Sequence, residues 1–495
     1  MRSLALLALA AGCFGQPVED ECRVRCGDGE ACPEDYRCAA DGFCHPSELA
    51  EPRVCTGGGD LTCEEAADCA VAEAVCRCGL CAVPDDGCVP SGLRYLGEAG
   101  ACAAGAVAVA AAASHSCAVQ SDGHAFCWGN NCHGELGNPD VPAGPSDCGD
   151  AEQSLSPVPV LRGGEPLAGV RTIHPGVTHT CALLDDGTAL CWGEDANGQL
   201  GRDGDGEVAL EPAPVVTSGG QALSGITALT SGWLHACALT GAGDAWCWGS
   251  NSNGQLGVAD WTGGGDSRSV AEPVVSEEAF ADIEAGLSHT CAVVAGGEAR
   301  CWGRDDIHQL GDSATCDTVD QPAPVAVLRE SDDMPLERAT IISAGNKFTC
   351  AASHTPDALL CWGDNAGHKL GDDSCPDCPD GYAVCLARET ELAPAAPVVR
   401  LAAGANSACA LLEGGALWCW GASDNGQIGV PTSEDWLAAT HVMDGVTDVS
   451  VGFDHACAIA GAGQVLCWGD NLDGELGTGD TGSSDVPVLL ADMCP

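Results

Sequence analysis

The tripeptide Cys-Trp-Gly occurs seven times between residues 127 and 469, and this repetition constrains the fold more than any other feature of the chain. Successive copies begin 64, 56, 54, 60, 58 and 48 residues apart. Repeats of this length are typical of proteins in which each repeat is one supersecondary unit packed against the next. The sequence therefore predicts seven similar units in a row.

Each unit carries the signals of four short strands. In the second unit, residues 170–173, 179–184 and 188–193 are predicted strands, with a turn at Asp186 and Gly187, and residues 214–216 are a predicted short fourth strand. Four strands per unit make one blade of a β-propeller. The predicted fold class is all-β, with a seven-bladed β-propeller over residues 101–495.

A second cysteine precedes each Cys-Trp-Gly cysteine, by ten residues in six units and by eleven in the fifth. A separation of ten places the two opposite each other if the hairpin loop has three residues, such as Ser121, Asp122 and Gly123. In the fifth unit a loop of four residues, 354–357, restores the same opposition. Opposed residues lie within disulfide range. The expected disulfides are Cys117–Cys127, Cys181–Cys191, Cys237–Cys247, Cys291–Cys301, Cys350–Cys361, Cys409–Cys419 and Cys457–Cys467.

A second shared stretch, Gly-x-Leu-Gly or a close variant, follows each Cys-Trp-Gly. Its first residue is Gly in five units and His308 or His368 in the other two. A recurring Gly suggests a turn with positive φ, which His tolerates better than most residues. The recurring Trp is predicted to pack between neighbouring blades.

The pattern His-x-Cys-Ala, Asp-Gly, Cys-Trp-Gly and Gly-Gln-Leu-Gly resembles the repeats of the regulator of chromosome condensation family, over about residues 101–492. The resemblance implies a seven-bladed β-propeller, a rigid disc whose loop-bearing faces bind other proteins. The nuclear founding member of the family exchanges guanine nucleotide on a small GTPase and contacts chromatin. Secreted bacterial relatives include protein inhibitors of β-lactamases.

Residues 1–12 have the layout of an export signal, because Arg2 is followed by a short apolar run from Leu4 to Ala11. The stretch Ala-Ala-Gly-Cys ending at Cys13 resembles the lipobox of bacterial lipoproteins, although Ala10 stands where Leu is usual. The resemblance implies that Cys13 is the lipid attachment site. The alternative is an ordinary signal peptide cut beside an incidental cysteine. The 35 cysteines also suit an oxidising compartment. We expect an exported lipoprotein of the outer membrane or cell surface, with secretion as the alternative.

Residues 13–100 are predicted to be a stalk held together by disulfides. Twelve cysteines lie between Cys22 and Cys88, and sequence alone leaves their connectivity open. In the propeller, Cys102 and Cys494 stand at the two ends of the repeats and are expected to pair and close the ring. Three further bridges are expected among the loop cysteines Cys132, Cys148, Cys316, Cys375, Cys378 and Cys385.

Charge and motifs narrow the function. With 19 basic and 72 acidic residues the net charge is −53, which argues against nucleic-acid binding. No cofactor, metal or catalytic site is predicted. The GxGxxG match at Gly477, Gly479 and Gly482 lacks a following helix, and Asp203 and Asp205 are expected to form a solvated loop rather than a calcium site. The recurring histidines are expected to be structural: His115, His179, His235, His289 and His455.

The function expected from these features is a non-enzymatic, lipid-anchored scaffold that binds a protein or a glycan through its loops. The alternative is a secreted propeller that inhibits an enzyme, for example a β-lactamase. A third possibility is a hydrolase or lyase hosted on the propeller, since a fold does not determine function. A cluster of histidine and carboxylate side chains in the central channel would distinguish the third possibility from the other two.

Overall fold

The computed structural model divides the chain into two compact units, Met1–Gly105 and Ala106–Pro495. In the first unit only the backbone of five short strands is described: β1 (Tyr36–Cys38), β2 (Cys44–Pro46), β3 (Val75–Arg77), β4 (Leu80–Pro84) and β5 (Leu93–Tyr95). The structure otherwise describes residues 105–144, 152–204, 206–312, 319–353, 359–371, 396–431, 436–490 and 493, and of residues 384–389 and 436–438 the backbone only.

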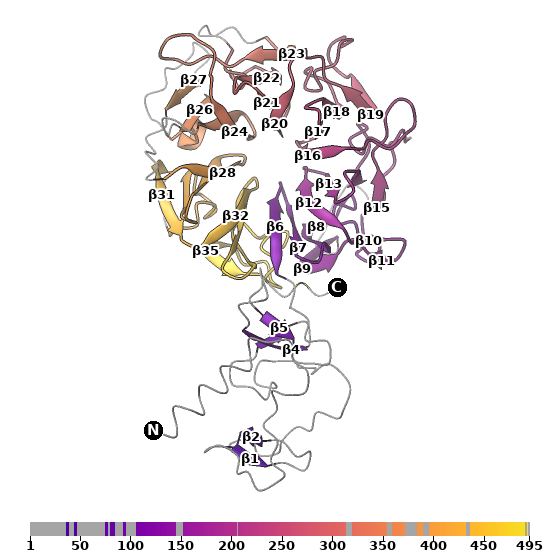
Figure 1. Cartoon of the computed structure of the whole chain (residues 1–495), viewed down its shortest axis with the longest axis vertical. Helices are drawn as coiled ribbons and strands as arrows, with labels where there is room; N and C mark the ends of the chain where they lie inside the picture. Colours follow the sequence, from indigo (N-terminus) through magenta and orange to yellow (C-terminus); the bar gives the residue numbers. More distant parts are fainter. Residues whose placement is uncertain are drawn as a thin grey trace. The chain divides into compact units, whose positions relative to one another are not determined.

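The second unit is a seven-bladed β-propeller, which confirms the predicted fold class (Figure 1). Each blade is a four-stranded antiparallel sheet built from four strands in chain order, with the first strand next to the central channel and the fourth at the outer edge. The first three strands of the predicted second blade lie where the sequence indicated, within two residues at each end.

The strands of blades 1 to 7 are, in order, β6 (Ala106–Ala111), β7 (His115–Gln120), β8 (Ala125–Asn130), β9 (Gln153–Pro159); β12 (Val170–Pro175), β13 (His179–Leu184), β14 (Ala189–Gly193), β15 (Ala209–Pro214); β16 (Ile226–Ser231), β17 (His235–Thr240), β18 (Ala245–Ser250), β19 (Ser267–Pro273); β20 (Phe280–Ala285), β21 (His289–Val294), β22 (Ala299–Gly303), β23 (Gln321–Ala326); β24 (Ala339–Ala344), β25 (Phe348–Ser353), β26 (Leu359–Asp364), β27 (Val384–Glu389); β28 (Val398–Ala403), β29 (Ser407–Leu412), β30 (Leu417–Gly421), β31 (Trp436–Met443); β32 (Val446–Val451), β33 (His455–Ala460), β34 (Gln464–Gly469) and β35 (Ser484–Leu489). A short hairpin, β10 (Leu161–Arg162) with β11 (Glu165–Pro166), and a 3-10 turn, η3 (Ala366–His368), complete the described elements.

The prediction for the fourth strand of blade 2 was wrong in position. The outer strand β15 covers Ala209–Pro214 and pairs with β14, whereas Val216 only bridges to Ala222. Two prolines within β15 made the strand hard to predict, because Pro has no N–H to donate to a neighbouring strand and is therefore a poor strand signal. At the outer edge one side of a strand needs no partner, so the prolines are tolerated there.

The second and third strands of every blade are joined by a disulfide. The register places Cys117 opposite Cys127, and the Cα atoms of all seven tandem pairs lie 4.0 to 4.1 Å apart. In blade 1 the loop has three residues, and Gly123 has φ of +84°. In the fifth blade Cys350 is still opposite Cys361, although the separation is eleven, while loop residues 354–357 lie outside the described part.

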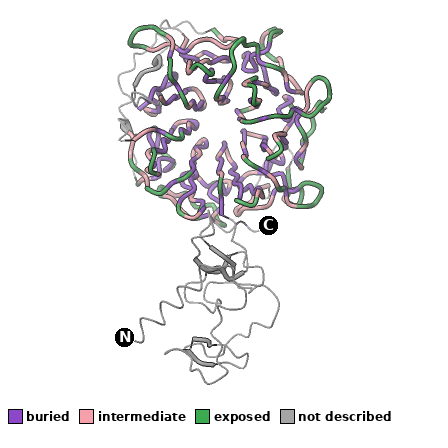
Figure 2. The backbone as a smooth tube through the Cα atoms, viewed as in Figure 1, coloured by how far each residue is buried: buried purple, intermediate pink, exposed green. Residues whose placement is uncertain are grey.

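The hydrophobic core is divided into seven clusters, and each cluster joins two neighbouring blades. One of them packs Cys117 and Leu136 of blade 1 against Ile173 and Trp192 of blade 2. The Trp of every Cys-Trp-Gly is at most 1% exposed, as Figure 2 shows in outline for the blade interiors. The predicted packing of Trp between blades is therefore confirmed.

The Gly-x-Leu-Gly stretch holds each blade against the next. Its first residue has positive φ in all seven blades, including 56° at His308 and 57° at His368, as predicted. Its last glycine lies against the Trp of the following blade. A Cβ atom at Gly137, for example, would lie 2.7 Å from Nε1 of Trp192.

Candidate functional site

The two faces of the propeller differ in the length of their connections. Because neighbouring strands are antiparallel, the first and third connections of each blade lie on one face and the second and fourth on the other. We call the first of these the long-loop face. In blade 1 it carries residues 112–114 and 131–144.

The first connections of neighbouring blades are in close contact around the channel at six of the seven blade boundaries. The amide of Asn346 donates to the carbonyl of Gly404 (3.0 Å), and that of Phe453 donates to the carbonyl of Ala112 (3.0 Å). The blades approach so closely here that a Cβ atom at Gly404 would lie 2.1 Å from the carbonyl oxygen of Gly452. The positions of close approach are Ala112, Gly176, Gly232, Gly286, Gly345, Gly404 and Gly452.

The residue after each of these positions forms the rim of the channel on the long-loop face. Six of the seven rim residues are apolar, and the seventh is Asn346. Trp233 is the most exposed of them, at 39%, whereas Leu287 and Ala405 are buried. The apolar rim consists of Ala113, Val177, Trp233, Leu287, Ala405 and Phe453. Sequence reasoning missed this rim, although apolar residues at six of seven equivalent turns are a signal present in the sequence.

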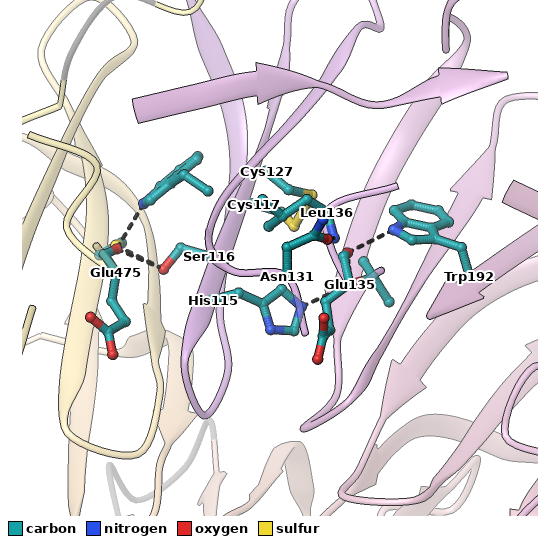
Figure 3. Close-up of a disulfide and its surroundings, with 12 residues drawn as sticks. His115, Ser116, Cys117, Cys127, Asn131, Glu135, Leu136, Trp192 and Glu475 are labelled. Carbon is teal, nitrogen blue, oxygen red and sulfur yellow. Dashed lines mark hydrogen bonds between the residues drawn. A yellow bond between two sulfur atoms is a disulfide. The ribbon is translucent and has the colours of Figure 1, made fainter. Parts of the chain in front are cut away.

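The third connections surround the rim and begin with one shared turn. Oδ1 of Asn131 accepts the amide of Leu136 (3.0 Å), so a side chain completes the turn (Figure 3). The same bond from the amide five residues later recurs at Asp195, Asn251, Asp305, Asn365 and Asn471.

Carboxylates gather on these third connections. In blades 2, 3 and 4 arginines pair with some of them: Arg202 with Asp195 (2.8 Å), Arg268 with Asp260 (2.7 Å) and Arg304 with Asp306. Asp424, Asp454 and Asp470 at the boundary of blades 6 and 7 have no Lys or Arg partner within the described ranges, and neither has Asp473 of the same third connection, whose Oδ2 accepts from the side-chain amide of Asn130 in blade 1 (3.4 Å). We call these four residues the acidic sector.

The carboxylates of the acidic sector influence one another. Burial raises the pKa of Asp454, and the nearby charges of Asp470 and Asp424 raise it further. Burial likewise raises the pKa of Glu475 to about 7, with Asp473 and Asp470 adding to the effect. Leu472 lies between Asp470 and Asp473 in the sequence and is 71% exposed.

Four of the five recurring histidines join neighbouring blades, while both ring nitrogens of the fifth, His179, have no hydrogen-bond partner in the described structure. Nε2 of His115 donates to Oγ1 of Thr180 (2.8 Å), and Thr180 donates to the carbonyl of Glu135 (2.9 Å). That carbonyl also accepts Nε1 of Trp192 (2.7 Å; Figure 3). Burial lowers the pKa of His115 to about 3, so the ring is neutral at pH 7. Equivalent bonds join His235 to Thr290, His289 to Thr349 and His455 to Ser116.

A set of polar side chains from four blades faces the central channel. Arg400 pairs with Asp448 (2.6 Å) and also influences the pKa values of His174, Asp282 and Glu284. Burial raises the pKa of Glu284 to about 8 and lowers that of His174 to about 3. Nε2 of His174 is hydrogen-bonded to Oγ1 of Thr172 (3.0 Å), and Oε2 of Glu284 accepts from Oγ1 of Thr230 (3.0 Å).

The carboxylates of this channel set join inner strands. Oδ2 of Asp448 accepts the amide of Val109 (3.1 Å), and Oδ2 of Asp282 accepts that of Ile342 (3.1 Å), each in the next blade. Because their lone pairs already hold neighbouring backbone amides, these two groups are structural. No group of three or more possible metal ligands is found in the described residues.

Several predicted site residues lie outside the described residues: Cys13, Cys102, Cys148, Cys316, Cys375, Cys378, Cys494 and Asp205. Cys132 is in a disulfide, and Cys385 lies on β27. The GxGxxG match at Gly477 is followed by strand β35. No described helix is long and apolar enough to cross a membrane.

Family comparisons agree with the repeats. A model of the regulator of chromosome condensation (RCC1) repeat matches residues 106–135, 176–199, 226–255, 280–307, 398–427 and 446–475, and a second RCC1 repeat model matches residues 122–183 and 242–293. The ultraviolet-B receptor UVR8 of Arabidopsis thaliana is 28% identical over 267 residues, which are 53% of this chain and 54% of UVR8. The mitochondrial RCC1 domain-containing protein RUG3 of the same plant is 31% identical over 257 residues, covering 50% of this chain and 54% of RUG3. The chain thus spans about half the length of these curated relatives.

Solved structures share the fold. Human WBSCR16 has a TM-score of 0.61 at 19% identity, covering 74% of this chain and 94% of that one. Yeast RCC1 (Prp20), solved in complex with Kap60, has a TM-score of 0.60 at 21% identity, covering 74% of this chain and 83% of that one. At these identities the likeness shows the fold alone.

Proposed function

Because the propeller is built of regulator of chromosome condensation (RCC1) repeats, we propose that the chain is a binding scaffold that holds a protein partner on its long-loop face. The observation that carries this proposal is the apolar rim, with Trp233 39% exposed at the channel mouth. Apolar centres surrounded by polar residues are the usual anatomy of protein interfaces, and Trp is enriched among their energetically dominant residues.

A binding role also agrees with the chemistry of the channel. The carboxylates of Asp282 and Asp448 are engaged by backbone amides, and every bridging histidine is buried and neutral. Groups held in this way stiffen the ring rather than move protons to a substrate. The yeast relative, which binds Kap60 in its solved structure, supports a role in protein interaction for this type of propeller.

We further propose that the scaffold is exported and anchored by lipid at Cys13. Support comes from the lipobox resemblance and from seven buried disulfides, which are typical of an oxidising compartment. Mass spectrometry of the mature N-terminus tests this point. An acylated Cys13 as first residue is expected, and an unmodified N-terminus after a later cleavage would refute lipid anchoring.

Site-specific photo-crosslinking tests the binding face. A photoreactive phenylalanine analogue replaces Trp233 in one full-length variant and Asp122, which lies on the opposite face with 44% of its side chain exposed, in another. We expect a crosslinked protein from the producing cells at position 233 and none at 122. Equal crosslinking at the two positions, or none at 233, would refute the proposed face.

A further inference from the structure

We infer that the protein partner presents a basic segment, with an apolar side chain between Lys or Arg residues, to the acidic sector at the boundary of blades 6 and 7. This inference rests on the proposed function and adds the chemistry of the partner. It starts from two apolar residues: Phe453 belongs to the rim, and Leu472, in the third connection of blade 7, is 71% exposed.

Carboxylates are close to these apolar residues in the sequence: Asp454 follows Phe453, and Leu472 lies between Asp470 and Asp473. The amide of Asp470 donates to the carbonyl of Asp454 (2.8 Å), so the two loops that carry them are joined. The charges of Asp424 and Asp470 both raise the pKa of Asp454, which places all three within electrostatic reach. An exposed apolar side chain with carboxylates beside it is complementary to a partner's apolar side chain flanked by Lys or Arg residues.

Elsewhere on the same face some carboxylates are paired with arginine, although Asp305, Asp312 and Asp320 of blade 4 also lie close together, since the charges of Asp312 and Asp320 raise the pKa of Asp305 beyond the effect of burial. In blades 2, 3 and 4 the chain's own arginines already neutralise carboxylates of the third connections, namely Arg202, Arg268 and Arg304. Among the described residues, the acidic sector has no such cation. A partner that brings cations would therefore reduce the repulsion among the carboxylates of the acidic sector.

The geometry favours a segment with several cations over a single metal ion. The carboxylates lie on three separate connections, and no described group of three or more could hold a metal. A metal ion needs its ligands converging at about 2.0 to 2.6 Å. A peptide with spaced Lys or Arg side chains can instead meet each carboxylate separately.

The test uses a display library of random 12-residue peptides selected on the full-length chain. We expect enrichment of peptides with net positive charge and an aromatic or aliphatic residue. Binding of one synthetic selected peptide is then measured by calorimetry. The double variant Asp454→Asn/Asp470→Asn should weaken it by about tenfold or more, and Leu472→Ser should weaken it by about fivefold.

The matched control is Asp122→Asn/Asp244→Asn, which removes the same charge from exposed positions on the opposite face. It should change the affinity by less than about twofold, because charges beyond a Debye length are screened. Raising the salt from about 0.05 M to 0.5 M should weaken binding to the native chain much more than to the acidic-sector variant.

The outcomes separate the two proposals. Neutral or acidic selected peptides that lose affinity on Trp233→Ala would overturn the inference and support the binding face. Basic peptides that bind the acidic-sector variant as tightly as the native chain would also overturn the inference. Peptides insensitive to every substitution on the long-loop face, or no selected peptide at all, would overturn both.

Discussion

Replacing Ala236 by Thr should stabilise the propeller, because it supplies a hydroxyl that four other blade boundaries have. At those boundaries a hydroxyl lies between a histidine Nε2 and a backbone carbonyl of the preceding blade, as in the bridge from His115 through Thr180 to Glu135. Between blades 2 and 3 the equivalent residue is Ala236. Both ring nitrogens of His179, which is fully buried, therefore have no partner in the described structure.

The expected gain follows from the bonds formed. The hydroxyl introduced by Ala236→Thr would accept from Nε2 of His179 and donate to the carbonyl of Gln199, which already accepts Nε1 of Trp248 (3.0 Å). A net hydrogen bond contributes about 1 kcal/mol, and leaving a buried group unpaired costs about 1 to 3 kcal/mol. Thr fits the same place at three other boundaries. We expect a gain of about 1 to 2 kcal/mol in the free energy of unfolding.

Equilibrium unfolding in guanidinium, followed by tryptophan fluorescence with the disulfides intact, measures this gain. The midpoint should rise with an unchanged slope. Ala236→Val adds similar volume without a hydroxyl and should give no gain, while Thr180→Ala should lose about as much as Ala236→Thr gains. If Val stabilises as well as Thr, or if Thr180→Ala has no effect, the hydroxyl bridge does not contribute as argued.

Two further substitutions test the inner ring and the buried acids. Gly404→Ala places a Cβ atom 2.1 Å from the carbonyl oxygen of Gly452 and should lower the free energy of unfolding by about 3 kcal/mol or more, measured by thermal or chemical unfolding. Gly296→Ala, with nothing within 4 Å of the added Cβ atom, should be nearly neutral. Equal effects of the two substitutions would contradict close packing at the ring. Glu475 has a folded-state pKa raised to about 7 from an ordinary value of 4.5, so the folded state holds a proton that the unfolded state releases, and stability falls as pH rises through that window. Glu475→Gln keeps the acceptor for the amide of Asp473, as Gln427 does for Asn425 in blade 6, and should stabilise by about 1 to 2 kcal/mol at pH 8 and little at pH 5. An equal effect at the two pH values would show that proton binding at this site is not responsible.

The features that sequence predicted well are those contained within one blade. The spacing of Cys117 and Cys127, and the compensating change at Cys350 and Cys361, follow from hairpin geometry over about a dozen residues. The outer strand β15 escaped prediction because edge position, rather than residue type, permits its prolines.

The features that sequence did not predict are assembled from one residue per blade. The apolar rim is built from one residue of each of six blades, so that Val177 contacts Trp233 from 56 positions along the chain and Phe453 contacts Ala112 from the other end of the repeats, once the blades are stacked. The channel set is similar, since Asp448 and Val109 meet across 339 residues. Only the stacking of blades decides which of these side chains face each other.

The way the ring closes also bears on how such a chain can be rearranged. Each sheet uses four strands in chain order, so blade 7 meets blade 1 through a boundary of the same kind as the other six, including the bonds from Ser116 and Trp128 to the carbonyl of Glu475. No strand is shared between the two ends within the described propeller. A circular permutation that opens the chain between any two blades would therefore keep every blade whole. For the same reason, tandem duplication of a whole blade requires no new kind of contact where the ring closes.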